Sequence, residues 1–70
     1  MAKMRLLSQA ELREAKETRK VVFLLLGDAF VPGIVAHISE VTQRPLFVSE
    51  DPRVNAAYVK QTAVFIPEET

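Results

Sequence analysis

The sequence predicts a small, strongly bent, five-stranded antiparallel barrel preceded by an N-terminal helix. A charged segment without glycine or proline near the start predicts the helix. A long apolar run, followed by Gly27-Asp28 and Gly33, predicts two strands joined by a tight turn, the second of them sharply bent. Two short apolar segments between Tyr58 and Pro67 predict the last strands. The chain of 70 residues is expected to form a single domain, residues 1–70, with the barrel at about residues 21–67.

A helix is expected at about residues 9–19, and its start is marked by a capping box. The Ser8 hydroxyl can accept a hydrogen bond from the Glu11 amide, and the Glu11 carboxylate can accept one from the Ser8 amide. Arg13 and Glu17 stand four residues apart and are expected to pair, which stabilises a helix by roughly 0.2–0.5 kcal/mol. The apolar stripe of this segment is thin, so the helix is expected to lie on a core rather than to build one.

The strands are expected where apolar runs are bounded by turn residues. The run from Val21 to Leu26 is apolar on both faces, which predicts that another layer or another subunit covers its second face. The second strand runs from residue 30 to about residue 40 and is bent at Pro32-Gly33, because proline lacks a ladder donor and glycine permits a bulge. Three shorter strands are expected at residues 46–48, 56–60 and 63–66.

The composition limits the kinds of function. The chain has no cysteine and one histidine, which excludes disulfides and thiolate metal sites, and no metal or cofactor is expected. Nine basic and nine acidic residues cancel, which argues against a strong overall attraction to nucleic acid. A domain this short is marginal alone, so oligomerisation is the expected source of extra stability.

The sequence shows no catalytic motif. It holds no glycine-rich phosphate loop, no nucleophile motif and no carboxylate pair flanked by apolar strands, so an enzyme is not expected. His37 has no Cys, Asp or second His near it, and such a histidine is more often a surface or edge group than a catalytic one. The longest apolar run, residues 21–26, is too short to cross a bilayer, and no apolar segment follows the basic start. A cytoplasmic protein without a membrane partner is expected.

Two motifs resemble those of the Sm-like family and, within it, the bacterial Hfq branch. The first is the apolar strand, turn and later glycine of residues 23–33, and the second is the pair Tyr58 and Pro67, nine residues apart with an apolar strand before the proline. The resemblance covers about residues 8–67. It implies a Sm-like (SH3-like) barrel that closes into a homo-ring of about five to seven subunits and binds single-stranded RNA weakly, without catalysis.

Candidate site residues follow from the resemblance and from the helix charges. In Sm-like rings the fourth strand pairs with the fifth strand of the next subunit, here Tyr58–Lys60 against Val64–Ile66. Tyr58 can stack on a base, or it can pack in an interface with its hydroxyl in water. The helix cations either line a nucleic-acid face or form a solvated helix face. The RNA-binding candidates are Tyr58, Lys60, Arg13, Lys16 and Arg19. The interface candidates are Tyr58, Val59, Val64, Phe65 and Ile66.

Three departures from the family pattern support a second hypothesis. Gly27-Asp28 inverts the usual order at the first turn, and Val59-Lys60 replaces the Lys-His pair of the second motif. The aromatic that stacks bases in the first motif has no counterpart near residues 39–41. In the second hypothesis the ring is therefore an oligomeric scaffold that binds a protein partner and has lost its RNA pockets.

Overall fold

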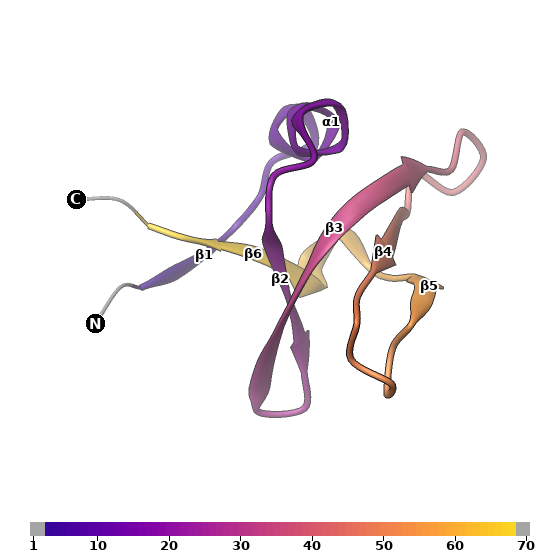
Figure 1. Ribbon diagram of the computed structural model, residues 1–70. Helices are drawn as coiled ribbons and strands as arrows, with labels where there is room; N and C mark the ends of the chain where they lie inside the picture. The colour runs from indigo at the N-terminus through magenta and orange to yellow at the C-terminus, as the bar shows by residue number, and fades with distance from the viewer. Residues whose placement is uncertain (1–2, 69–70) are drawn as a thin grey trace.

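The computed structural model describes residues 3–68, which form one antiparallel sheet of six strands and a single α-helix with a short 3-10 helix. The elements are β1 (Met4–Leu6), α1 (Gln9–Thr18), β2 (Val22–Leu26), β3 (Ala29–Ile38), β4 (Pro45–Val48), β5 (Ala56–Tyr58), η1 (Gln61–Ala63) and β6 (Val64–Pro67). The strand order in the sheet is β1-β6-β2-β3-β4-β5. Figure 1 shows β1 and β6 at one end of the molecule, the β2–β3 hairpin projecting downward, and β4 and β5 at the other end.

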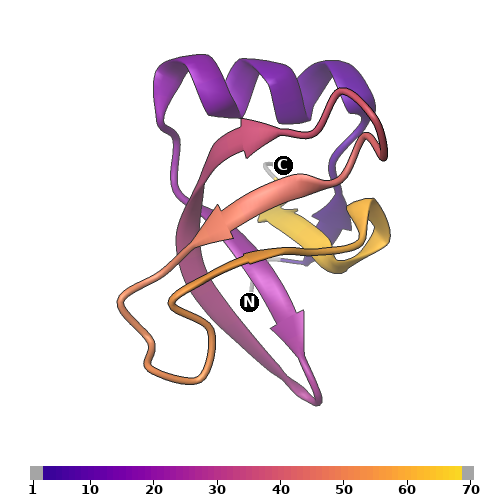
Figure 2. The same ribbon diagram turned by 90° about the vertical axis from the view of Figure 1, so that its right-hand side faces the viewer.

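The mostly β fold with one helix agrees with the prediction, and the five-stranded barrel does not, because the strands form an open six-stranded sheet. The sheet has six strands and stays open, with β1 and β5 as its two edges. The five strands that follow the helix are the five predicted ones, and their ends differ from the predicted ends by no more than two residues. Figure 2 shows α1 lying across the top while the sheet curls beneath it.

β1 is the strand that the sequence did not predict, because three residues are too few to show an alternating pattern. It forms because β6 offers it an edge: Leu6 lies opposite Phe65, and the Leu7 N–H continues the ladder to the Val64 carbonyl at 3.3 Å. On its other side Phe65 lies opposite Phe23 of β2. The edge of β6 is therefore not open for the expected pairing of residues 64–66 with residues 58–60 of a neighbouring subunit.

The helix begins and ends for local reasons. The predicted capping box is confirmed: the Ser8 Oγ accepts from the Glu11 N–H at 3.2 Å, and the Glu11 Oε1 accepts from the Ser8 N–H at 3.0 Å. At the other end Arg19 is the C-cap in the left-handed conformation, with φ of 53°. The Lys20 N–H then donates to the Ala15 carbonyl at 3.2 Å, which closes the helix.

Replacing Arg19 with glycine is expected to stabilise the fold. A left-handed φ costs a residue with a Cβ roughly 1–2 kcal/mol, and glycine avoids this cost. Part of the gain is offset because glycine has greater conformational freedom in the unfolded chain. Urea unfolding should therefore show a gain of about 0.5–1 kcal/mol for Arg19→Gly. Lys20→Gly is the control, because Lys20 has no positive φ; a gain of the same size there would contradict this account.

The core lies between α1 and the inner face of the sheet. Leu12 and Ala15 supply the helix side, and Leu7 supplies the link before it. The strands contribute every second residue, as the two-residue period of a strand requires. These inner-face residues are Val22, Leu24, Val31, Val35, Phe47, Val64 and Ile66. The alternate residues of the same strands point the other way and define what is here called the outer face.

Gly33 is the point at which β3 passes from one half of the sheet to the other. β3 pairs with β2 as far as Gly33 and with β4 from Ile34 onward. A Cβ added at Gly33 would lie 2.5 Å from the Phe47 ring and 2.5 Å from the Val48 carbonyl oxygen. Since Phe47 is fully buried, its ring has no room to withdraw. Glycine is therefore required for the close approach of β3 to β4.

Gly33→Ala is expected to lower the free energy of unfolding by about 1–3 kcal/mol, because the methyl group forces the packed ring and the β4 backbone apart. Chemical denaturation measures the change. Gly27→Asn is the matched control: Gly27 has a φ of +64°, which asparagine tolerates, and open space where the Cβ would lie. Equal losses in the two variants would mean that the close approach at Gly33 is not the cause.

Candidate functional site

A β-bulge in β3 turns His37 away from the core. Val35 lies opposite the buried Phe47, but the next paired residue on β3 is His37, opposite Leu46. Ala36 is the extra residue. In a regular strand the side chains alternate, so His37 would share the inner face with Val35. The bulge breaks this alternation and directs both Ala36 and His37 outward. Both side chains are exposed.

His37 lines a cleft between α1 and the turn that joins β3 to β4. The cleft has a volume of about 290 Å³. It brings together two of the predicted RNA-binding residues, Arg13 and Lys16, with a histidine and the polar side chains of the turn. Its lining residues are Arg13, Lys16, Glu17, His37, Ile38, Ser39, Glu40 and Gln43.

The turn side of this cleft is held by its own hydrogen bonds. The Ser39 Oγ accepts from the backbone N–H groups of Val41 at 3.3 Å and Thr42 at 3.2 Å. The Gln43 N–H donates to the Ser39 carbonyl at 2.9 Å, and its Nε2 donates to the Glu40 carbonyl at 3.2 Å. Among the described residues the Gln43 side-chain oxygen accepts no hydrogen bond, while the Ser39 hydroxyl is engaged with the turn.

The charges of the cleft are balanced. Arg13 and Lys16 face Glu17 and Glu40, so two cations meet two carboxylates. Within residues 3–68 ion pairs form only between Arg5 and Glu11 and between Arg53 and Asp51, so the expected pair of Arg13 with Glu17 is not made. The two cations of the cleft are consequently available to an incoming anion, but the nearby carboxylates will weaken its binding.

Tyr58 shares the outer face with His37. Leu46 lies opposite His37 on one side and opposite Tyr58 on the other, so the three form one row across β3, β4 and β5. Two strand spacings separate the end residues of this row by roughly 10 Å. Tyr58 is 51% exposed. The fold thus places two aromatic side chains on one surface, with Arg13 and Lys16 beside the first.

The remaining two RNA-binding candidates lie outside this cleft. Lys60 is exposed and precedes η1, in the link between β5 and β6. Arg19 is exposed at the C-cap of α1 and is not among the lining residues of the cleft. Sequence reasoning missed Ser39 and Gln43 and treated His37 as an ordinary surface group, because the bulge that aims His37 outward leaves no mark in the residue pattern.

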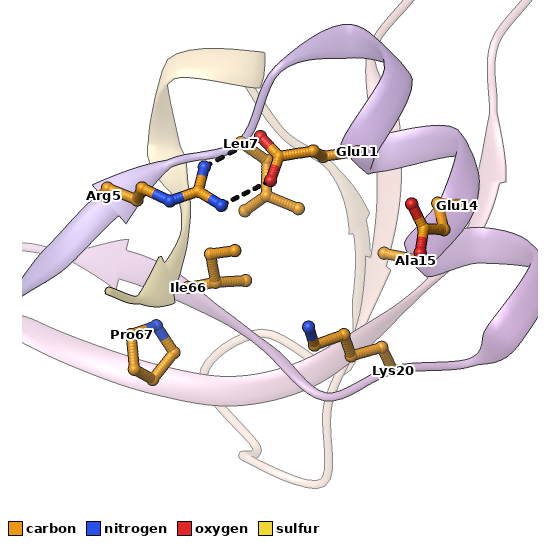
Figure 3. A pocket seen from close by; sticks show the side chains of 8 residues that line it. All are labelled: Arg5, Leu7, Glu11, Glu14, Ala15, Lys20, Ile66 and Pro67. Atoms are coloured by element: carbon orange, nitrogen blue, oxygen red, sulfur yellow. Dashed lines mark hydrogen bonds and ion pairs between the residues drawn. The ribbon is translucent and has the colours of Figure 1, made fainter. Parts of the chain in front are cut away.

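A second cleft, of about 240 Å³, lies between β1, β6 and the other side of α1 (Figure 3). Leu7, Ala15 and Ile66 form its apolar wall, with Lys20 and Glu14 on one side of it. On the other side the Arg5 guanidinium donates to Glu11 Oε1 at 2.8 Å and to Oε2 at 2.5 Å. This bidentate pair joins β1 to the first turn of α1.

The Glu11 carboxylate accepts hydrogen bonds both from Arg5 of β1 and from the backbone N–H of Ser8 at the helix cap. The hydrogen bonds from Arg5, and after them the one from the Ser8 backbone, lower the pKa of Glu11 from its usual 4.5 to about 2. The unfolded chain therefore binds a proton at a higher pH than the folded chain does. The stabilisation from Glu11 is fully present above about pH 4.5 and is lost as the pH falls toward about 2.

Comparison of the wild type with Glu11→Gln across pH tests this linkage. The wild type should be the more stable of the two at neutral pH, and the difference in the free energy of unfolding should shrink as the pH falls from about 4.5 to about 2. Thermal or urea unfolding at each pH gives the difference. In an Arg5→Met background most of this pH dependence should disappear; a difference that persists unchanged there would assign it to another partner.

The outer face of β1, β6, β2 and β3 is apolar. A cross-strand row runs from Leu6 through Phe65 and Phe23 to Pro32, since each lies opposite the next. A second row pairs Leu25 with Phe30. The Phe30 and Phe65 rings meet edge to face at a centroid distance of 5.3 Å. We call these residues the outer patch: Leu6, Phe23, Leu25, Phe30, Pro32 and Phe65.

No described element covers the outer patch, and Leu6 and Phe30 are 44% and 41% exposed. An apolar groove of about 560 Å³ extends it past Pro32 to Val21 and Val48. Contiguous apolar surfaces of this kind mark interaction sites. The second face of β2 is therefore apolar, as predicted, and no described element covers it. That another layer or subunit covers it stays a prediction.

The described residues offer no metal site of the usual kind, since no three of their His, Asp or Glu side chains come together to hold an ion. Nor is any helix within residues 3–68 long and apolar enough to span a bilayer. Comparison of the chain with known proteins finds no matching family model, no matching curated protein and no matching solved structure. The resemblance to Sm-like proteins thus rests on the residues of the two motifs.

Proposed function

We propose that this chain is a Sm-like subunit that assembles with copies of itself and binds single-stranded RNA without catalysing a reaction. The helix followed by five strands is the element order that the resemblance implies. The cleft between α1 and the β3–β4 turn is the observation that carries the RNA-binding part. There the bulge brings His37 to the two helix cations, Arg13 and Lys16.

The groups in this region match the chemistry of unpaired RNA. Arg13 and Lys16 can bind phosphate oxygens, and the imidazole of His37 and the phenol ring of Tyr58 can each stack on a base. The Gln43 amide oxygen can accept from a base edge or a ribose hydroxyl. Stacking on flat rings tolerates many sequences, so we expect weak base preference. The carboxylates of the cleft limit the affinity of one subunit, and assembly compensates by presenting one cleft for each subunit.

Binding without catalysis is part of this proposal. No hydrogen bond within residues 3–68 joins His37 to Glu17 or Glu40, so His37 has no oriented partner to act as an acid–base pair. The described chain buries no polar or charged side chain, whereas shifted catalytic groups usually lie in such surroundings. A binding role is the simpler account of an exposed Arg13, a half-buried Lys16 and two exposed aromatic rings.

Removing both cleft cations should weaken RNA binding. Labelled oligo-U and oligo-A are titrated at low salt with the wild type and with Arg13→Ala/Lys16→Ala, expecting at least a tenfold loss on both. The slope of log affinity against log salt should become shallower by roughly 0.7 for each phosphate that the variant no longer neutralises. Lys20→Ala/Arg53→Ala is the control, with the same charge change away from the cleft. An equal loss of RNA affinity in the control variant would mean that the net charge, and not the cleft, determines binding.

A second candidate function is a scaffold for a protein partner, and the outer patch is the observation that favours it. The patch carries no charged residue, whereas a nucleic-acid surface needs cations. It also lies apart from the cleft, so the two functions can be separated by mutation. Failure of RNA binding at tens of micromolar protein would make this second candidate the better account.

Phe30→Asp tests the outer patch. It should abolish retention of a partner from a lysate of the source cells while leaving RNA binding intact, because Phe30 lies far along the hairpin from the cleft. The loss of its edge-to-face packing on Phe65 should destabilise the fold by only about 0.5–1.5 kcal/mol. Val41→Asp is the control, since Val41 is 92% exposed and outside the patch. If Val41→Asp also failed to retain the partner, the loss would not be specific to the outer patch, and the patch would not be the binding surface.

A further inference from the structure

The open sheet leaves two edges, and the direction of their free backbone groups can be worked out. In β1, Leu7 N–H donates to the Val64 carbonyl and the Lys3 carbonyl accepts from Glu68 N–H. Antiparallel ladders alternate between bonded and non-bonded pairs, so Arg5 also bonds toward β6. The N–H and C=O groups of Met4 and Leu6 therefore point away from β6, to the edge of the sheet, where the Leu6 carbonyl accepts from the Arg5 guanidinium.

The free edge of β5 follows in the same way. Ser49 N–H donates to the Asn55 carbonyl at 2.8 Å, and Val59 N–H donates to the Pro45 carbonyl at 3.0 Å. Residues 55, 57 and 59 thus bond toward β4. Ala56 and Tyr58 are left with their N–H and C=O groups directed outward. Each edge therefore offers two residues with an outward N–H and an outward C=O. The Leu6 carbonyl already accepts from Arg5 Nη1 at 3.3 Å, so a pairing strand must use its second lone pair.

On both edges the residues with free backbone groups also carry the outer-face side chains. Leu6 lies opposite Phe65 of the outer patch, and Tyr58 lies opposite Leu46. Ala57, between the two free residues of β5, lies opposite the buried Phe47 and faces inward. Any strand that pairs with these edges must therefore bond through outer-face residues.

Because the residues with outward backbone groups also carry the outer-face side chains, one way of joining two copies is favoured. In antiparallel pairing, bonded residues lie directly opposite and share a face, so β5 and β1 would join outer face to outer face. In parallel pairing, Leu6 would bond to Ala56 and Tyr58 and share a face with Ala57, which would set the outer side of one copy against the inner side of the next. Antiparallel pairing alone continues the apolar surface across the joint.

The charges argue against joining two β1 strands. In antiparallel β1–β1 pairing through Met4 and Leu6, Arg5 would lie directly opposite the second copy's own Arg5, and like charges at such positions are destabilising. In β5–β1 pairing, Arg5 lies opposite Ala57 and keeps its bond to Glu11. The free edge of β1 is thus suited to a β5 edge and unsuited to itself.

We propose that copies of this chain join edge to edge, with β5 of one copy antiparallel to β1 of the next, Ala56 opposite Leu6 and Tyr58 opposite Met4. The inference rests on the self-assembly proposed above and replaces its expected contact through residues 64–66. The contact is head to tail, so it closes into a ring when the rotation permits. It buries two exposed edge side chains, Leu6 and Tyr58, and leaves neither sheet edge free.

Cysteine cross-linking tests the register, because the natural chain has no cysteine. Bonded antiparallel residues have Cα atoms about 5.5 Å apart, within the range that a disulfide spans. Mild oxidation of Leu6→Cys/Ala56→Cys should give a ladder of covalent multimers on a non-reducing gel. A mixture of the two single variants should give a covalent dimer that neither variant gives alone. A dimer formed as readily by Ala56→Cys alone would overturn the proposal in favour of β5–β5 pairing.

The second test removes one edge donor without touching the interior. The Ala56 N–H points outward, so Ala56→Pro should spare the β4–β5 bonds and block addition at the edge. Light scattering should find it as a monomer with wild-type circular dichroism, and the control Ala56→Ser should stay assembled. A proline variant that keeps the assembled mass overturns the edge contact.

The outcomes separate this inference from the proposed function. An assembled wild type whose double-cysteine variant forms no disulfide overturns the β5–β1 contact and leaves RNA binding to its own titration. A wild type that is monomeric by light scattering at micromolar concentration overturns both self-assembly and the contact. Absence of RNA binding alone leaves the β5–β1 contact supported wherever the covalent ladder appears.

Discussion

The close approach of Gly33 to Phe47 is the contact on which the rest of the structure depends. β3 is shared by both halves of the sheet, and it can change partners from β2 to β4 only where its backbone lies against the Phe47 ring. That ring is also a fully buried member of the core beneath α1. The helix, the cleft beside it and the position of both sheet edges therefore all follow from a residue without a side chain.

One strand thus serves two surfaces with different chemistry. Before Gly33, β3 carries Phe30 and Pro32 and extends the uncharged outer patch. Beyond Gly33 a bulge turns His37 outward, and the same strand supplies an aromatic to a cleft lined by two cations and two carboxylates. Apolar contacts are non-directional and do not depend on charge, whereas phosphate contacts weaken as salt rises. If both proposed roles hold, this division of β3 lets a subunit bind a protein neighbour and a nucleic acid by forces that do not compete.

The sequence alone predicted those elements that depend on residues close to one another in the chain. The capping box set the start of α1, and apolar runs bounded by Gly and Pro placed all five strands after it. It was insufficient where distant segments decide. β1 exists only because β6 needs a partner, and an open sheet differs from a closed barrel in contacts that no local pattern encodes. For the site, Arg13 and Lys16 were named from the helix charges and Tyr58 from the family resemblance. Only the bulge and the helix packing show which of them share a surface with His37.

The shared carboxylate of Glu11 has a consequence for the behaviour of this protein in acid. Once Glu11 is protonated, Arg5 and the helix cap lose a common charged acceptor, and β1 is retained by a ladder of only three residues. Release of β1 would bare the backbone of Val64-Phe65-Ile66, a β-branched and aromatic segment without a charge of its own. An uncovered apolar edge strand is a site at which copies of a chain associate. The short N-terminal strand therefore covers an apolar edge of the sheet, and its attachment to the helix weakens in acid.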